Sequence, residues 1–129
     1  MFLMCLYIIE KTYLYYKMVN KVSFKTRDEC KQCLLSNKFV VIKVSAKWCG
    51  PCKRISSLVE ACLEELPSNV ITIIVDFDAH RDVASALRIK NVPTFMLYID
   101  GMPDICLVGA NKQKVHKFFQ AVNQKVLQG

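Results

Sequence analysis

The chain has 129 residues, 53% of them hydrophobic, with only four glycines and four prolines, which excludes a disordered or collagen-like chain and suffices for one domain with a core. The formal net charge of +7 is spread along the sequence, and its densest cluster, Lys112, Lys114 and Lys117, has no aromatic stacking platform beside it, so we expect no nucleic-acid partner. Seven cysteines, an odd number without the spacing of a secreted disulfide scaffold, indicate a reducing compartment.

The first 17 residues contain an apolar run, FLMCLYII, followed by EKTYLYYK. The run lacks a basic stretch before it and a small-residue cleavage site after it, unlike a signal peptide, and it is far shorter than the roughly 20 residues that span a bilayer. Three interpretations stay open: an extension that is weakly ordered or reflects start-codon choice at Met1 or Met18, an extra strand or helix, or an uncleaved membrane anchor. We therefore divide the chain into an extension of uncertain order, residues 1–17, and a domain, residues 18–129.

The first half of the domain alternates strand and helix patterns. Residues 19–24 read as a short strand, and Thr26 with Glu29 forms a capping-box signature that opens a helix ending near residue 36. Residues 39–46, FVVIKVSA, are too continuously apolar for a half-exposed strand, which predicts a central strand covered on both faces. A long amphipathic helix then follows WCGPCK and stops at Pro67.

The second half predicts two more strands, a short helix, a hairpin strand and a final helix. Residues 70–78 form a buried strand pattern, and a short helix covers residues 81–87. Residues 92–100 turn at Asp100-Gly101, with Met102 and Pro103 lengthening the loop, into a strand over residues 105–108. The last helix, residues 111–127, begins at Asn111. Right-handed crossovers make the first three strands parallel, which predicts an α/β fold with a mixed five-stranded sheet and four helices on both faces.

Two CxxC pairs, Cys30/Cys33 and Cys49/Cys52, are separated by fifteen residues, a spacing that also matches a four-thiolate zinc site. Zinc needs all four sulfurs about 2.3 Å from one ion. The predicted strand 39–46 holds the pairs more than about 20 Å apart, so we expect no shared metal. Cys30, Cys33, Cys62 and Cys106 are then expected to be buried core residues, although an exposed Cys30/Cys33 pair would be able to oxidise.

Cys49 and Cys52 lie where the central strand meets a helix. Unpaired N–H groups and the helix dipole stabilise a thiolate at Cys49, which predicts that Cys49 attacks and Cys52, one turn later, resolves. Gly50 permits a tight approach, and Pro51 suits the first helical turn because its missing N–H is no loss there.

The motifs WCGPCK (48–53), VDFDAHRDVA (75–84), NVPTF (91–95) and GANKQKV (109–115) occur in the order and spacing of the thioredoxin family. The chain resembles thioredoxins of the eukaryotic type over residues 18–129. The resemblance implies the thioredoxin fold and a small protein-disulfide reductase, and CGPC without an intervening histidine favours a reductant.

The resemblance also assigns roles to individual residues. Trp48 would flank an exposed Cys49 sulfur, and Pro93 matches the family's cis-proline beside the dithiol. The backbone of Val92 would hold an extended substrate segment, while Gly109 and Ala110 would complete an apolar docking rim.

The same resemblance implies no bound cofactor or metal, with electrons from NADPH through a thioredoxin reductase and disulfide-containing proteins as substrates. It suggests a cytoplasmic monomer without a membrane partner, acting in electron transport and cell redox homeostasis. One alternative is a protein-binding module with incidental redox activity. Another is an oxidase or isomerase in an oxidising compartment.

Lys43 is a departure from the family, which places a buried acid there as the base for the resolving cysteine. A lysine in a doubly covered strand must have a lowered pKa, pair with a carboxylate or extend to the rim. A charged Lys43 would favour the reduced dithiol, whereas a neutral one would itself accept the proton of Cys52. A side chain pointing away would do neither.

Four other polar residues are weaker candidates for a role in the site. Asp76 and Asp78 end a strand near the expected site, where solvation is the commoner role, and His80 and His116 are expected at the surface.

Overall fold

The computed structural model describes residues 3–8, 20–24 and 26–129. Residues 3–8 are helical with exposed side chains, while Met18 and most of the extension lie outside the described residues. No helix among the described residues is long and apolar enough to cross a membrane. The division of the chain at residue 18 stays a prediction.

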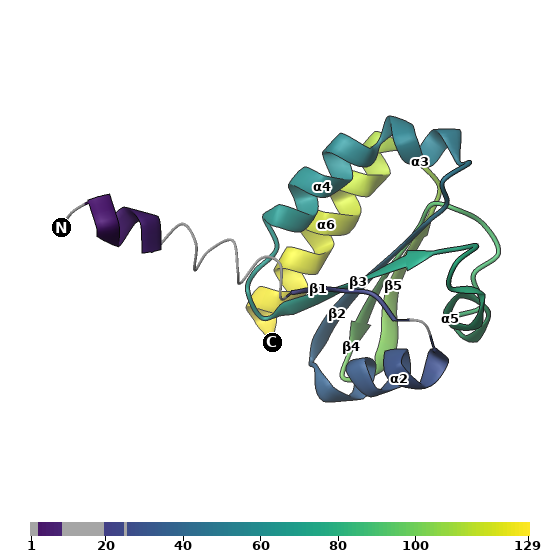
Figure 1. The fold of residues 1–129 in the computed structure, drawn as a ribbon, viewed down its shortest axis with the longest axis horizontal. Coiled ribbons are helices and arrows are strands. Elements are labelled where there is room, and N and C mark those ends of the chain that lie inside the picture. The colour runs from purple at the N-terminus through teal and green to yellow at the C-terminus, as the bar shows by residue number, and fades with distance from the viewer. Residues whose placement is uncertain (1–2, 9–19, 25) are drawn as a thin grey trace.

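The domain is built around a five-stranded sheet in the order β1-β3-β2-β4-β5 (Figure 1). The strands are β1 (Lys21–Val22), β2 (Phe39–Ser45), β3 (Val70–Asp76), β4 (Thr94–Ile99) and β5 (Met102–Val108). β1, β3 and β2 are parallel, and β4 and β5 are antiparallel to their neighbours. The predicted mixed sheet, with its three parallel strands, is confirmed.

Five helices cover the two faces of the sheet (Figure 1). They are α2 (Arg27–Ser36), α3 (Gly50–Arg54), α4 (Ser56–Glu64), α5 (Arg81–Ala86) and α6 (Lys112–Gln128). α3, α4 and α6 pack on one face and α2 and α5 on the other. Since β2 is apolar on both faces, its side chains alternate between the two clusters: Val41 packs under α4 and α6, and Val40 packs under α2.

The helix caps form as the sequence indicates. Thr26 caps α2 by accepting a hydrogen bond from the Glu29 N–H, and Asn111 caps α6 through the Lys114 N–H at 3.0 Å. Each cap satisfies a backbone donor that has no partner inside the helix.

The single long helix predicted after Cys49 is wrong, because it breaks at Ile55 into α3 and α4. The carbonyl of Lys53 accepts from the Ile55 N–H and from the Ser56 hydroxyl at 2.9 Å. These bonds replace the regular helical ladder at that carbonyl, which accounts for the break.

The predicted loop at Met102 and Pro103 is also wrong. Asp100 and Gly101 both have positive φ, 51° and 79°, which closes a two-residue hairpin directly. Met102 and Pro103 therefore begin β5, and the edge position of this strand tolerates a proline. The prediction that Cys106 is buried is also wrong. Cys106 lies on β5, the edge strand of the sheet, opposite Met96 of β4, and it is exposed.

Candidate functional site

The site lies at the end of β2, where the chain turns into α3. Cys49 and Cys52 are joined by a disulfide, with their Cα atoms 5.3 Å apart. Cys30 lies on α2, in the core cluster on the other face of the sheet. The two CxxC pairs therefore belong to different parts of the fold.

The start of α3 is organised around the sulfur of Cys49. Cys49 is the N-cap residue, and its Sγ accepts from the backbone N–H of Cys52 at 3.1 Å. Pro51 lies in the first turn, where no N–H is needed. A Cβ added at Gly50 would meet none of the protein's own atoms within 4 Å. The tight approach predicted for Gly50 would therefore be that of a bound partner and not of this chain. The donated N–H and the helix terminus favour negative charge on Cys49.

The expected exposure of Cys49 is wrong for the disulfide form, in which the residue is only 2% exposed. It instead borders a pocket of about 420 Å³. The pocket is lined by Trp48, Cys49, Gly50, Pro51, Phe77, Lys90, Asn91 and Val92. Phe77 and Asn91 belong to the motifs VDFDAHRDVA and NVPTF, but neither was given a role of its own, and Lys90, which precedes NVPTF, was not singled out from the sequence.

The loop before β4 lies against the dithiol. The Val92–Pro93 peptide is cis, and the Val92 carbonyl oxygen is 3.8 Å from Cys49 Sγ. Gly109, with φ 108°, donates its N–H to the Pro93 carbonyl at 2.9 Å. Gly109 and Ala110 thus adjoin the loop but do not line the pocket, and their role as a docking rim stays a prediction.

Trp48 stands out from the surface beside the dithiol, 66% exposed. Its indole Nε1–H donates to Asp78 Oδ2 at 2.6 Å. Asp76 caps the same turn, since its Oδ1 accepts from the backbone N–H groups of Ala79 and Asp78, which lower the pKa of Asp76. The backbone N–H of Asp76 in turn donates to the half-buried ring of His80, so this histidine belongs to the turn. Asp78 orients Trp48, a role that the sequence did not indicate.

Removing the Asp78 carboxylate should free the Trp48 indole. Because Trp48 is the one tryptophan of the chain, intrinsic fluorescence reports on it directly. We expect Asp78→Ala to lower the fluorescence anisotropy and to slow disulfide reduction about two- to fivefold, on the order of one exposed hydrogen bond. Asp78→Asn, which keeps an acceptor, and Asp28→Ala, an exposed carboxylate on α2, should behave like wild type. Unchanged anisotropy in Asp78→Ala would contradict this role.

Lys43 pairs with a carboxylate, which was one of the arrangements predicted for it. Its Nζ lies 3.5 Å from Oε1 of Glu60 on α4, and its side chain is 16% exposed. Glu60 was not singled out from the sequence.

The other cysteines of the domain differ from the dithiol. Burial raises the pKa of Cys30 to about 11, with a further contribution from the neighbouring Cys33. Burial also raises the pKa of Cys33 and of Cys62, both of which are half-buried and not fully buried as expected. Raised thiol pKa values disfavour the reactive thiolate, so these cysteines are poor nucleophiles. Within the described part of the chain, no three Cys, His, Asp or Glu side chains are grouped to hold a metal ion.

Comparison with known proteins agrees with this geometry. Residues 21–122 match the family described as Thioredoxin. Human thioredoxin is 40% identical over 98 residues, which cover 76% of this chain and 92% of the human protein. An H-type thioredoxin from Populus jackii is 39% identical over 85 residues, 66% of this chain and 60% of that protein.

Solved structures agree with the sequence relatives. Plasmodium falciparum thioredoxin matches with a TM-score of 0.69 at 29% identity, covering 77% of this chain and 96% of that one. Fasciola hepatica thioredoxin also has a TM-score of 0.69, at 30% identity and the same coverage. With the CGPC disulfide at the start of α3 and the cis-proline loop against it, the chain belongs to the thioredoxin family of thiol–disulfide oxidoreductases.

Proposed function

We propose that this chain reduces disulfide bonds in other proteins, with Cys49 as the attacking thiolate and Cys52 as the resolving thiol. The observation that carries the proposal is the hydrogen bond from the Cys52 N–H to Cys49 Sγ. It places a backbone donor and a helix terminus at one sulfur of the pair, which lowers the cost of a negative charge on that sulfur.

The reaction is a two-step exchange. The Cys49 thiolate attacks one sulfur of the substrate disulfide, the substrate S–S bond breaks, and the departing thiolate takes up a proton. Cys52 then loses its proton and attacks Cys49, which breaks the mixed disulfide and releases the second substrate thiol. Two electrons pass to the substrate, and the chain is left with the Cys49–Cys52 disulfide.

The pocket beside Cys49 is the proposed place for the substrate chain. Val92 lines this pocket, and its carbonyl, which lies 3.8 Å from Cys49 Sγ, would accept a hydrogen bond from an extended segment, as a strand edge would. Trp48 and Pro51 supply apolar surface to the lining of the pocket, while Gly109 and Ala110 extend the proposed contact area beyond Pro93.

The disulfide must be reduced again after each turnover. We propose that the electrons come from NADPH through a thioredoxin reductase, without a cofactor bound to this chain, and that the protein works as a monomer in the cytoplasm. The absence of a histidine between Cys49 and Cys52 supports a reductant, because such a histidine favours the thiolate and a more oxidising pair.

Reduction of insulin disulfides, followed by turbidity and by NADPH consumption, tests the proposal. We expect the chain, supplied with thioredoxin reductase and NADPH, to precipitate insulin many times faster than the reductase and NADPH alone. Replacing the reductase by dithiothreitol separates the two parts of the proposal, since a chain active only with dithiothreitol would contradict the reductase as electron donor. A chain inactive with both reductants would contradict disulfide reduction and favour the protein-binding alternative.

A further inference from the structure

Lys43 places a positive charge in the layer between the sheet and α4. Along β2, Phe39 and Val41 point into the core cluster beneath α4 and α6, and Lys43 is next in this alternation. Its ammonium group reaches Glu60 on α4 at 3.5 Å, and only 16% of its side chain is exposed. A cation this far from water needs a fixed partner, because removing it from water is costly.

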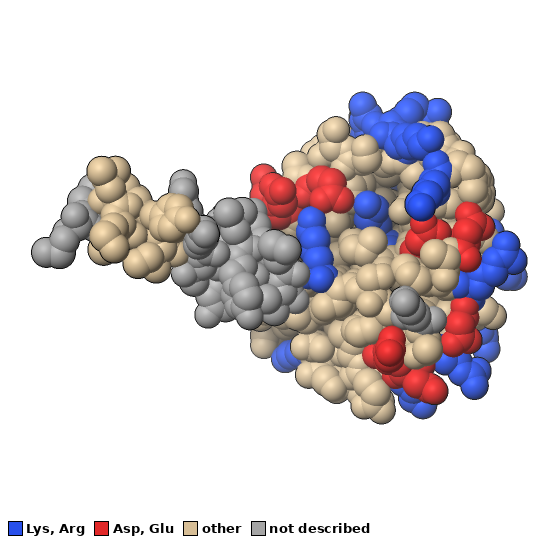
Figure 2. All heavy atoms as spheres, viewed as in Figure 1, with Lys and Arg blue, Asp and Glu red and all other residues tan. Residues whose placement is uncertain are grey.

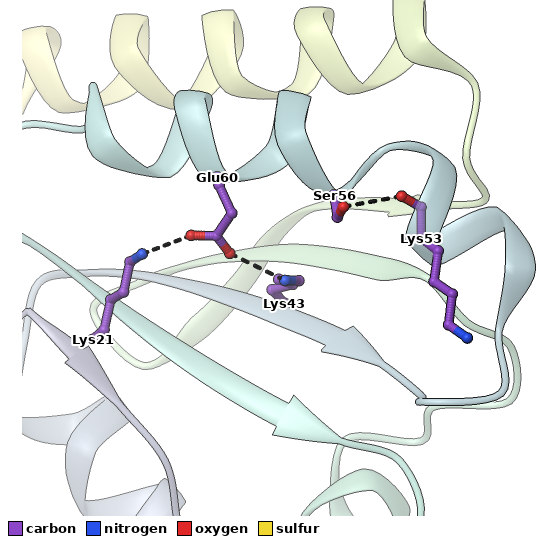
Figure 3. A network of polar contacts seen from close by, with 5 residues as sticks. All are labelled: Lys21, Lys43, Lys53, Ser56 and Glu60. Atoms are coloured by element: carbon purple, nitrogen blue, oxygen red, sulfur yellow. Dashed lines mark hydrogen bonds and ion pairs between the residues drawn. The ribbon is translucent and has the colours of Figure 1, made fainter.

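Glu60 serves two cations at once (Figure 3). Its Oε1 contacts Lys43, and its Oε2 lies 2.9 Å from Nζ of Lys21 on β1. Burial by itself would raise the pKa of Glu60, but the hydrogen bonds and charges of Lys21 and Lys43 together hold it below its usual value. Glu60 is therefore ionised at neutral pH, and the three side chains carry a net charge of +1.

This network belongs to the same helical layer as the dithiol. Cys52 on α3 precedes Glu60 on α4 by eight residues, a stretch that would span about 12 Å at 1.5 Å per residue if the helix ran unbroken through Ile55. Ser56 lies midway between them in the sequence, at the start of α4. Ile55 and Val59 are buried in this layer, but the Glu60 side chain is 47% exposed and that of Lys21 is 35% exposed, so water screens the charges in part. Two unit charges about 10 Å apart interact appreciably at an effective dielectric constant of ~20. A unit charge at that distance from a thiolate therefore changes the equilibrium that forms the thiolate by a factor on the order of ten.

We propose that Glu60 is a positioning residue that fixes and offsets the charge of Lys43 and thereby keeps the Cys49–Cys52 pair reducing. This inference rests on the proposed exchange reaction. An uncompensated cation in this layer would favour the thiolates of the reduced state and so make the disulfide a stronger oxidant. The carboxylate of Glu60 opposes that effect and holds the ammonium group of Lys43 against α4.

Equilibration of the chain with oxidised and reduced glutathione at about pH 7 measures the effect. The dithiol and glutathione disulfide exchange two electrons and two protons to give the Cys49–Cys52 disulfide and two reduced glutathiones. We expect Glu60→Gln to lower this equilibrium constant about tenfold, which corresponds to about 30 mV for a two-electron couple. Glu60→Asp should stay within about threefold of wild type. Glu64→Gln, the same change at an exposed position on the same helix, should have no effect.

Lys43→Met supplies the opposite arm of the test. Removing this cation should raise the equilibrium constant. In the Lys43→Met background Glu60→Gln should lower the constant by a smaller factor than in wild type, because the part of its effect that comes from holding the Lys43 ammonium group is lost and only the field of its own carboxylate remains. Lys117→Met, an exposed lysine on α6, controls for net charge. Should Glu60→Gln fail to fold, Lys21→Met replaces it in the test. We expect Lys21→Met to raise the equilibrium constant, as Lys43→Met does, but by a smaller factor.

Three results would overturn the inference: Glu60→Gln equal to wild type, shifts of the same sign in Glu60→Gln and Lys43→Met, or a Glu60→Gln shift that persists in full without Lys43. A merely structural role for Glu60 would change the unfolding temperature without shifts of opposite sign. A wild-type chain that does not exchange with glutathione at all would instead contradict the proposed function, and this inference with it.

Discussion

Replacing Cys49 with serine is expected to reduce the rate of insulin-disulfide reduction to the uncatalysed background. Serine keeps the size of the side chain, but its hydroxyl is not ionised near neutral pH and cannot attack a disulfide. Cys52→Ser should also stop turnover, in a different way. Cys49 would still attack, and because no resolving thiol remains, the substrate would stay attached through a mixed disulfide that migrates as a covalent complex on a non-reducing gel and disappears with dithiothreitol.

The chain offers a matched control in Cys62, a half-buried cysteine on α4 outside the dithiol. Cys62→Ser should reduce insulin at the wild-type rate. The assignment of the two roles would be reversed if Cys49→Ser, and not Cys52→Ser, accumulated the mixed disulfide. Full activity of Cys49→Ser would exclude this thiol as the nucleophile.

Phe95→Ala is expected to destabilise the domain by about 3–5 kcal/mol, the range for truncating a buried phenylalanine. Phe95 is fully buried near the start of β4, and its ring centroid lies 5.9 Å from that of Phe118 and 6.1 Å from that of Phe119 on α6. The Phe118 and Phe119 rings meet edge to face at 5.2 Å. Loss of the Phe95 ring leaves a cavity and removes two aromatic contacts. The expected loss of stability is a large fraction of the roughly 5–15 kcal/mol by which a domain is stable.

Urea denaturation of the oxidised protein, followed by circular dichroism, measures this change as a shift in the unfolding midpoint. Phe95→Leu, which fills most of the cavity, should cost less than half as much as Phe95→Ala. Leu35→Ala, an apolar truncation at an exposed position of α2, should stay within about 0.5 kcal/mol of wild type. A loss below about 1 kcal/mol in Phe95→Ala would show that this aromatic cluster does not hold α6 on the sheet.

Much of the fold follows from local patterns of residues. The continuous apolar run of β2 predicts a strand covered on both faces, and the Thr26 and Asn111 caps mark where α2 and α6 begin. These signals work because they depend on the backbone within a few residues. The wrong predictions also have local causes. The carbonyl of Lys53 accepts two hydrogen bonds from nearby donors, which breaks a helix that the apolar periodicity predicted to be continuous. Two positive φ angles close the Asp100-Gly101 hairpin without extra residues.

Burial at the edge of the sheet was harder to predict. Cys106 has the apolar neighbours of a core strand, but β5 has a partner on one side only. The cluster beneath α2 and α5 includes Met96 on β4 but does not extend to Cys106, which is exposed. Whether a strand is central or at an edge depends on the order of the strands in space, which its own residues do not encode.

The sequence by itself determined the dithiol, its place at a strand-to-helix junction and the family motifs around it, because a CxxC at a helix start is a local arrangement. Only the tertiary structure decided how the surroundings of the dithiol are arranged. Asp78 reaches Trp48 across 30 positions of the chain, and Glu60 reaches Lys43 across 17. Pairing with a carboxylate was one of the options for a lysine in this strand, but which carboxylate it meets depends on how α4 crosses the sheet, and that crossing is set by the packing of the whole core.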